Sequence, residues 1–255
     1  MTSMANFVYN GLISNLWRIT LKKTILFDLD GTLLPLEMEK FFEAYIYSIS
    51  SFCSKLINPK LFVPHLLEST EKMVRNNGRM TNEEVFMESF LPPLDLKKED
   101  AYPVFEEYYL TEFRKLKGYT EPSSVVPQVV EAALEQGYQI VLATNPLFPR
   151  LAVEERMRWA GVLDYPWSYI TSYETSCFCK PNPQYFEEIS TLLKLKPEEC
   201  WMVGNDSQED MVAGELGFRT YLVTDNLIGK GNSYIKPDKT GALSEFLLFL
   251  QNDLK

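Results

Sequence analysis

The sequence predicts an α/β protein in which a doubly wound, parallel-sheet core carries a smaller α-helical domain. From residue 122 onward, short apolar runs alternate with segments of helical periodicity, an order typical of parallel strands joined by helices. One further apolar run, residues 24–27, is separated from that set by a long stretch with helical patterns only. We therefore expect residues 1–34 and 119–255 to form the core and residues 35–118 to form a helical insertion.

The individual elements follow from local patterns. Residues 24–27 are apolar or β-branched and precede a turn, as expected of a buried strand. In the helical stretch, Thr81 and Glu84 have the spacing of a capping box, which predicts a helix beginning there. The other helices expected in this stretch span residues 39–57, 61–76 and 99–117. The core is expected to contain strands 139–143, 169–171, 200–203 and 220–223 and helices 126–136, 149–160, 183–194, 208–216 and 241–250.

The charge of the chain bears on its partners and location. Its 255 residues include 35 acidic and 25 basic side chains, giving a net charge of -10. Such a chain repels nucleic acid and anionic membranes, so we expect neither as a partner. No apolar run approaches the roughly 20 residues of a membrane span, and the first residues lack a secretory signal pattern. We expect a cytoplasmic protein, with a short amphipathic helix or an added extension over residues 8–19.

Histidine and cysteine content restricts the chemistry. The single histidine, His65, excludes catalytic triads based on histidine and zinc sites that need two histidines. Cys53, Cys177, Cys179 and Cys200 are too scattered for a disulfide framework and are expected to be reduced thiols. Catalysis is therefore expected to use carboxylates, hydroxyls and amines.

The first candidate motif, Asp28-Leu29-Asp30-Gly31-Thr32, directly follows the strand at 24–27. Two carboxylates one residue apart on an extended backbone lie on the same side. They can hold a hard divalent cation and leave one oxygen free to attack phosphorus. Gly31 permits the tight turn that this placement needs. The structural alternative is an acidic turn after a buried strand.

Two further motifs supply donors and a cation. Thr144 and Asn145 follow the strand at 139–143 and could donate hydrogen bonds to a phosphoryl oxygen, although Thr-Asn-Pro is also common in turns. Lys180 is followed by two prolines in the sequence Lys-Pro-Asn-Pro, just before a predicted helix. It offers the positive charge that an acidic protein needs in order to accept a phosphate. A solvated loop lysine is the alternative there.

The fourth motif contains a second pair of carboxylates. Asp206 follows the strand at 200–203, and Asp210 lies about one helical turn later, so that both can point toward one cation. Acidic residues also stabilise the first turn of a helix, which is the structural alternative.

Together, these motifs and their order resemble the haloacid dehalogenase superfamily over about residues 22–35 and 120–235. Asn205, inserted before the first aspartate of the fourth motif, departs from the commonest family pattern. The resemblance implies that Asp28 is the nucleophile, that Asp30 is the general acid and base, and that Thr144, Asn145 and Lys180 contact the phosphoryl group. It also implies a helical cap over residues 35–118.

The same resemblance implies a Mg²⁺ site. Asp28, the main-chain carbonyl of Asp30 and Asp206 would bind the ion, with Asp210 supporting it directly or through water. Physical chemistry agrees, because phosphoryl transfer depends on positioned charges and Mg²⁺ needs only a few protein ligands.

The resemblance also favours hydrolysis of a phosphoric monoester as the activity. Family members that cleave carbon–halogen bonds usually lack the second aspartate of the first motif, so Asp30 favours phosphoryl transfer. We expect a phosphatase acting on a small phosphorylated metabolite. A sugar-phosphate mutase or another phosphotransferase stays open at this point, as does a catalytically silent binding protein.

Overall fold

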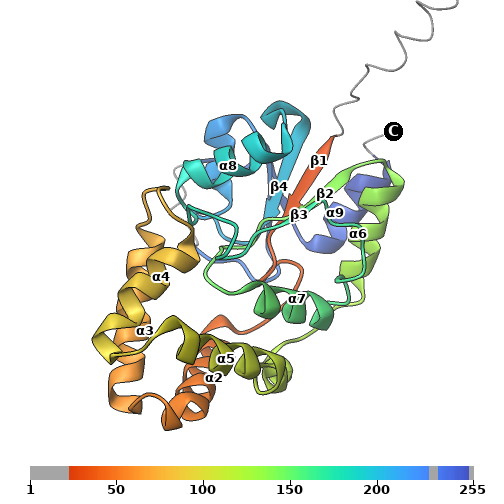
Figure 1. The fold of residues 1–255 in the computed structure, drawn as a ribbon. Helices are drawn as coiled ribbons and strands as arrows, with labels where there is room; N and C mark the ends of the chain where they lie inside the picture. The colour runs from red at the N-terminus through yellow and green to blue at the C-terminus, as the bar shows by residue number, and fades with distance from the viewer. Residues whose placement is uncertain (1–22, 230–234, 253–255) are drawn as a thin grey trace, which may run out of the picture.

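The computed structural model describes residues 23–229 and 235–252 (Figure 1). Within them lies a six-stranded parallel sheet of order β3-β2-β1-β4-β5-β6, which confirms the predicted α/β fold. The first strand, β1, pairs with both β2 and β4 and is central, as expected from the isolated apolar run. The amphipathic helix predicted over residues 8–19 lies outside the described residues.

Most predicted strands agree with the structure to within a residue. Their bounds are β1 Thr24–Phe27, β2 Gln139–Leu142, β3 Tyr169–Ile170, β4 Cys200–Gly204, β5 Arg219–Val223 and β6 Lys239–Gly241. The edge strand β6 was not predicted, because its three residues are partly or fully exposed and show no apolar alternation. In the part of the chain that the structure describes, no helix is long and apolar enough to cross a membrane.

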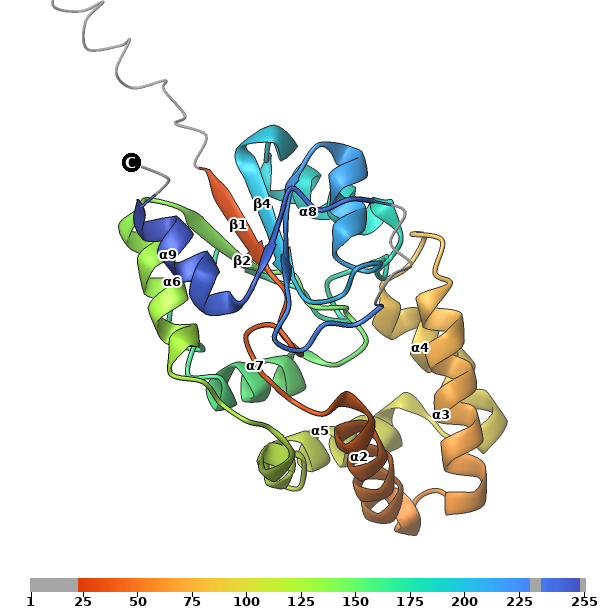
Figure 2. The same ribbon diagram turned by 180° about the vertical axis from the view of Figure 1, so that it is seen from behind.

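Alternate residues of β1 face opposite layers of helices. Phe27 packs in one apolar cluster with residues of α6 (Val125–Glu135) and α9 (Leu243–Asn252). Leu26 packs in a second cluster with α8 (Pro183–Leu193) and the 3₁₀ helix η5 (Met211–Leu216). The ribbon shows these layers on the two sides of the sheet, with α7 (Arg150–Trp159) near the carboxyl ends of the strands (Figures 1 and 2).

The prediction of an α-helix over residues 208–216 was wrong in type. This segment forms turns followed by the 3₁₀ helix η5, and the short η4 (Pro197–Glu199) precedes β4. The side chain of Asp206 accepts hydrogen bonds from the backbone nitrogens of Gln208 and Glu209, which tightens the chain directly after β4.

The helical block between β1 and α6 agrees largely with prediction. It contains α2 Met38–Phe52, α3 Pro59–Val74, α4 Asn82–Phe90 and α5 Lys98–Leu110, with 3₁₀ helices η1 Cys53–Lys55, η2 Pro92–Leu94 and η3 Phe113–Tyr119. The predicted capping box is present, because Thr81 and Glu84 exchange hydrogen bonds at the start of α4. The helix predicted over 99–117 breaks at Thr111, whose backbone leaves the helical region.

Two chain crossings join this block to the core. Leu36 and Thr120 form an antiparallel bridge, and the backbone nitrogen of Glu121 donates to the carbonyl of Pro35 at 2.8 Å. Both views place α2, α3, α4 and α5 together, opposite the carboxyl end of β1 (Figures 1 and 2). The block therefore faces the edge of the sheet where the candidate motifs lie.

An aromatic contact fixes the block against α7. Phe113 of η3 is fully buried and stacks on Trp159 with ring centroids 5.3 Å apart. We expect Phe113→Ala to lower the free energy of unfolding by about 3–5 kcal/mol, because it removes a buried ring and leaves a cavity. Urea unfolding measures this loss. Tyr119→Ala, at a site 47% exposed in the same 3₁₀ helix, is the control, and equal losses in both variants would contradict the prediction.

Candidate active site

The candidate motifs meet in one pocket of about 420 Å³ between the sheet edge and the helical block. Six of the seven predicted site residues line it, namely Asp28, Asp30, Thr144, Asn145, Asp206 and Asp210. The seventh, Lys180, lies behind the pocket wall and is 1% exposed. Residues far apart in the chain thus converge at one place, as the sequence predicts.

Lys180 joins the first and fourth motifs. Its Nζ donates to Oδ1 of Asp28 at 2.9 Å and to Oδ1 of Asp210 at 2.6 Å. Burial by itself lowers the pKa of Lys180, but the carboxylates of Asp210 and Asp28 outweigh that effect and raise the pKa well above its usual value. Lys180 therefore stays charged and holds a positive charge against the predicted nucleophile.

The two carboxylate oxygens of Asp210 are both engaged within the protein. Oδ1 accepts from Lys180, and Oδ2 accepts from the backbone nitrogen of Asp206 at 3.0 Å. A side chain on Gly204 would collide with this carboxylate, since a Cβ there would lie 2.1 Å from Oδ2 of Asp210. Because both oxygens are already engaged, Asp210 is better suited to positioning Lys180 and Asp206 than to binding a metal ion directly.

The turn after β1 needs its glycine. Gly31 has a φ of +85°, and a Cβ there would lie 2.2 Å from Nδ2 of Asn205. Asn205 uses the space that Gly31 leaves, accepts from the hydroxyl of Thr32 at 2.9 Å and donates to the carbonyl of Asn226 at 2.6 Å. The residue that departs from the family pattern therefore locks the first motif to the fourth.

Sequence reasoning missed Arg156 of α7. It is 1% exposed, forms a close ion pair with Oδ2 of Asp30, and lies over the ring of Phe148 with Cζ 4.4 Å from the centroid. Burial raises the pKa of Asp30 above its usual value, and the charge of Arg156 opposes that rise. The periodic pattern of α7 carries no signal for this contact, because the partners are 126 residues apart.

Asn145 and Glu209 form a second bridge at the pocket. Oδ1 of Asn145 accepts from the backbone nitrogen of Lys180 at 3.2 Å, and Nδ2 donates to Glu209 at 3.0 Å. Besides its predicted contact with the phosphoryl group, Asn145 therefore also positions the loop that carries Lys180. Burial raises the pKa of Glu209 to about 7, so this carboxyl is close to half ionised at neutral pH.

The donors at the pocket suit a hard cation. Across the described residues, no three His, Cys, Asp or Glu side chains are grouped so as to enclose a metal by themselves. Magnesium needs only one or two protein carboxylates because it keeps several waters. Asp28, Asp30 and Asp206 line one pocket, so the oxygen donors available there fit Mg²⁺ chemically.

Comparison with known proteins identifies the family. A model of haloacid dehalogenase-like hydrolases matches residues 22–217. The chain belongs to this hydrolase family. The resemblance seen in the sequence motifs is thereby confirmed, and the chain is an enzyme of a family whose members include phosphatases.

Individual relatives are distant. The pyrophosphatase PpaX of Bacillus mycoides (strain KBAB4) is 26% identical over 219 residues, covering 84% of this chain and 90% of that protein. A 2-haloacid dehalogenase from Pseudomonas syringae pv. Tomato DC3000 superposes with a TM-score of 0.61 at 17% identity, covering 92% of this chain and 100% of that one. The HAD-hydrolase YfnB of Bacillus subtilis, a structure bound to magnesium, superposes with a TM-score of 0.53 at 18% identity, covering 90% and 98%.

Removing the buried cation of this hydrolase tests its structural role. Lys180→Met leaves Asp28 and Asp210 as neighbouring buried carboxylates, so we expect the free energy of unfolding to fall by about 3–5 kcal/mol. Urea unfolding at pH 7 measures it. The double variant Lys180→Met/Asp210→Asn is expected to recover part of the loss, whereas the exposed control Lys60→Met is expected to change little. A double variant no more stable than the single one would contradict this account.

The raised pKa of Glu209 predicts a pH-dependent effect in the hydrolase without divalent metal. The pKa of Glu209 is about 7 in the folded protein and about 4.5 in the free side chain. Between these two pH values the carboxyl group is ionised in the unfolded chain and protonated in the folded one, so the free energy of unfolding falls as the pH rises. Glu209→Gln is expected to be stabilising by an amount that grows above pH 4.5, by at most about 1.4 kcal/mol per pH unit, and levels off above pH 7. Thermal unfolding from pH 4 to 8 checks this, with Glu187→Gln as an exposed control. A difference independent of pH would contradict it.

Proposed function

We propose that this hydrolase is a Mg²⁺-dependent phosphatase that cleaves a small phosphorylated metabolite through an aspartyl-phosphate intermediate. The observation that carries the proposal is the buried Lys180 bonded to Asp28 at the wall of a pocket that Asp30 and Asp206 share. The pyrophosphatase activity in the name of the PpaX relative, which is also a phosphoryl transfer to water, and the magnesium in the YfnB structure support it.

The chemistry divides between Asp28 and Asp30. One carboxylate oxygen of Asp28 attacks phosphorus, the bond from phosphorus to the leaving oxygen breaks, and Asp30 gives that oxygen a proton. Asp30 then takes a proton from water, the water oxygen attacks phosphorus, and the bond to Asp28 breaks to release inorganic phosphate. Burial raises the pKa of Asp30 and so favours uptake of the proton that this step needs, while the ion pair with Arg156 opposes that uptake.

Charges around the nucleophile would assist both steps. Lys180 neutralises Oδ1 of Asp28, so the carboxylate can approach an anionic phosphoryl group. Asp28, the Asp30 carbonyl and Asp206 would hold Mg²⁺, which when bound would offset the charge that builds up on the phosphoryl oxygens. Thr144, which is 2% exposed and lines the pocket, would donate its hydroxyl to one of those oxygens.

We further propose that residues 35–118 form a cap domain that covers the pocket and that residues 1–34 and 119–255 form the catalytic core. The paired crossings at Leu36 and Thr120 support these boundaries. The four free cysteines support an assignment to the cytoplasm. The net charge of -10 supports a small metabolite as the partner over nucleic acid or a membrane.

The proposed nucleophile can be tested by charge removal. Asp28→Asn is expected to abolish phosphate release from phenyl phosphate in the presence of Mg²⁺, and Asp30→Asn is expected to lower kcat by about 10²–10⁴-fold. Colorimetric phosphate release measures both, and chelation of the metal is expected to stop the wild-type reaction. Asp164→Asn, an exposed carboxylate outside the pocket, is the control. Activity that survives Asp28→Asn would overturn the mechanism.

A further inference from the structure

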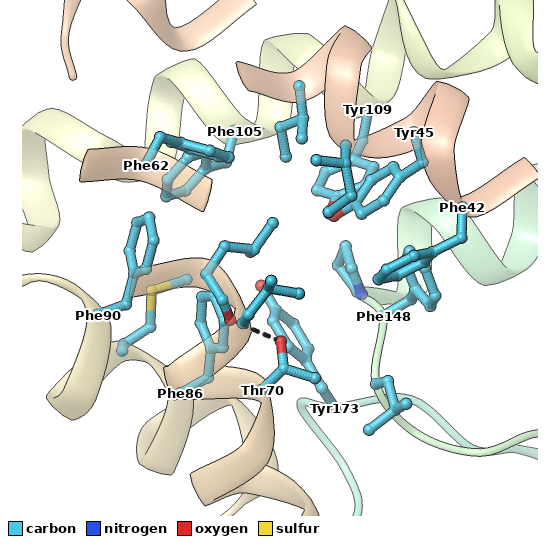
Figure 3. Close-up of a pocket in the computed structure, with 17 residues that line it drawn as sticks. Phe42, Tyr45, Phe62, Thr70, Phe86, Phe90, Phe105, Tyr109, Phe148 and Tyr173 are labelled. Atoms are coloured by element: carbon cyan, nitrogen blue, oxygen red, sulfur yellow. Dashed lines mark hydrogen bonds between the residues drawn. The ribbon is translucent and has the colours of Figure 1, made fainter. Parts of the chain in front are cut away.

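A partly open aromatic cavity lies within the helical block, beside the catalytic pocket (Figure 3). It has a volume of about 70 Å³ and is lined by side chains of α2, α3, α4 and α5, of the loop that precedes α7 and of the loop that follows β3. Figure 3 shows rings from several elements pointing toward one another across it, including Phe62, Phe86, Phe90 and Tyr109. Its walls carry no charged side chain.

The aromatic cavity adjoins the catalytic pocket. Phe42, Leu147 and Phe148 line both spaces, so they form the boundary between them. A molecule whose phosphoryl group lies at Asp28 can direct the rest of its body past these three side chains. The cavity is therefore placed to receive part of a leaving group.

Charges at the boundary select against an anionic leaving group. The helical block contributes Met38, Glu39, Phe41 and Phe42 to the catalytic pocket, and among them Glu39 alone is charged. The buried cations near the pocket are paired: Lys180 with two aspartates, and Arg156 with Asp30. A second negative group directed toward the helical block would meet Glu39 and no cation among the residues that this block contributes to the pocket. The cationic atom without a hydrogen-bond partner, Nη2 of Arg156, lies on α7 and outside this block.

The polar atoms of the cavity suit a neutral molecule. Tyr45 and Tyr109 join their hydroxyls at 2.9 Å, and Thr70 donates to the carbonyl of Leu66 at 2.8 Å. Burial raises the pKa of Tyr45 to about 12, so its hydroxyl stays uncharged at neutral pH. These groups can share a hydrogen bond with an uncharged polar atom, and they offer no counter-charge to an ion.

We infer that the substrate is a phosphate monoester of a small, uncharged, apolar alcohol or phenol, whose apolar end enters the aromatic cavity. The inference rests on the proposed phosphatase function and adds the class of leaving group to it. The cavity is about half of the roughly 150 Å³ that holds benzene in an engineered apolar site, so it takes the end of an apolar group and not a second ring.

Two substrates of matched shape test the inference. With Mg²⁺ present, kcat/KM for 4-methylphenyl phosphate is expected to exceed that for 4-carboxyphenyl phosphate at least tenfold. Equal values, or a preference for the carboxylate, would overturn the inference while leaving the phosphatase function intact. Hydrolysis of neither compound would overturn the phosphatase function.

Binding of 4-methylphenol, measured by calorimetry on the whole chain, separates the cavity from turnover. Saturable binding is expected, and 4-hydroxybenzoate is expected to bind at least tenfold more weakly. If 4-methylphenol binds but no phosphate ester is cleaved, the phosphatase function fails and the assignment of the apolar cavity stands. Absence of 4-methylphenol binding overturns the assignment.

A charge placed at the boundary is expected to reverse the preference. Phe42→Lys introduces a cation at a side chain that is 40% exposed and borders both spaces. It is expected to lower kcat/KM for the methyl compound and raise it for the carboxylate, changing their ratio at least tenfold. Tyr47→Lys is the matched control, because Tyr47 lies on the same helix, is 78% exposed and lines neither space. The inference would be overturned if Phe42→Lys left the ratio of the two kcat/KM values unchanged. It would also be overturned if Tyr47→Lys changed that ratio by the same factor.

Discussion

The buried contact of Lys180 with Asp28 and Asp210 is the interaction on which the site depends. A lysine in an apolar interior is costly unless carboxylates surround it, and two buried carboxylates are costly unless a cation neutralises them. The carboxyl ends of β1 and β4 supply the carboxylates, and the segment before α8 supplies the cation. Alignment of these segments at one sheet edge therefore satisfies an electrostatic requirement and creates the site at the same time.

Patterns that act over a few residues predicted most of the fold and most of the site. The apolar run at 24–27, the Asp-x-Asp-Gly-Thr turn and the Thr81–Glu84 capping box are local, and the structure contains each of them. Asp28, Thr144 and Asp206 could be placed at one pocket because parallel strands bring their carboxyl ends to the same edge.

The features that sequence reasoning missed depend on tertiary contacts. Arg156 has an ordinary place in the pattern of α7, and its ion pair with Asp30 exists only once α7 lies near the carboxyl end of β1 (Figure 1). The edge strand β6 is polar and short, so no periodicity marks it. The helix expected over 208–216 is replaced by turns and a 3₁₀ helix, since Asp206 and Asp210 bind the backbone and Lys180 there.

The bridge between Leu36 and Thr120 brings the two ends of the helical block next to each other. A long insertion whose ends are neighbours changes nothing in the register of the sheet, because the strand before it and the helix after it keep their positions whatever lies between. The helical block can thus be replaced by another insertion of different shape without a change in the structure of the core. The side chains at the sheet edge and those that the helical block contributes to the pocket can therefore be exchanged separately during evolution or in the laboratory.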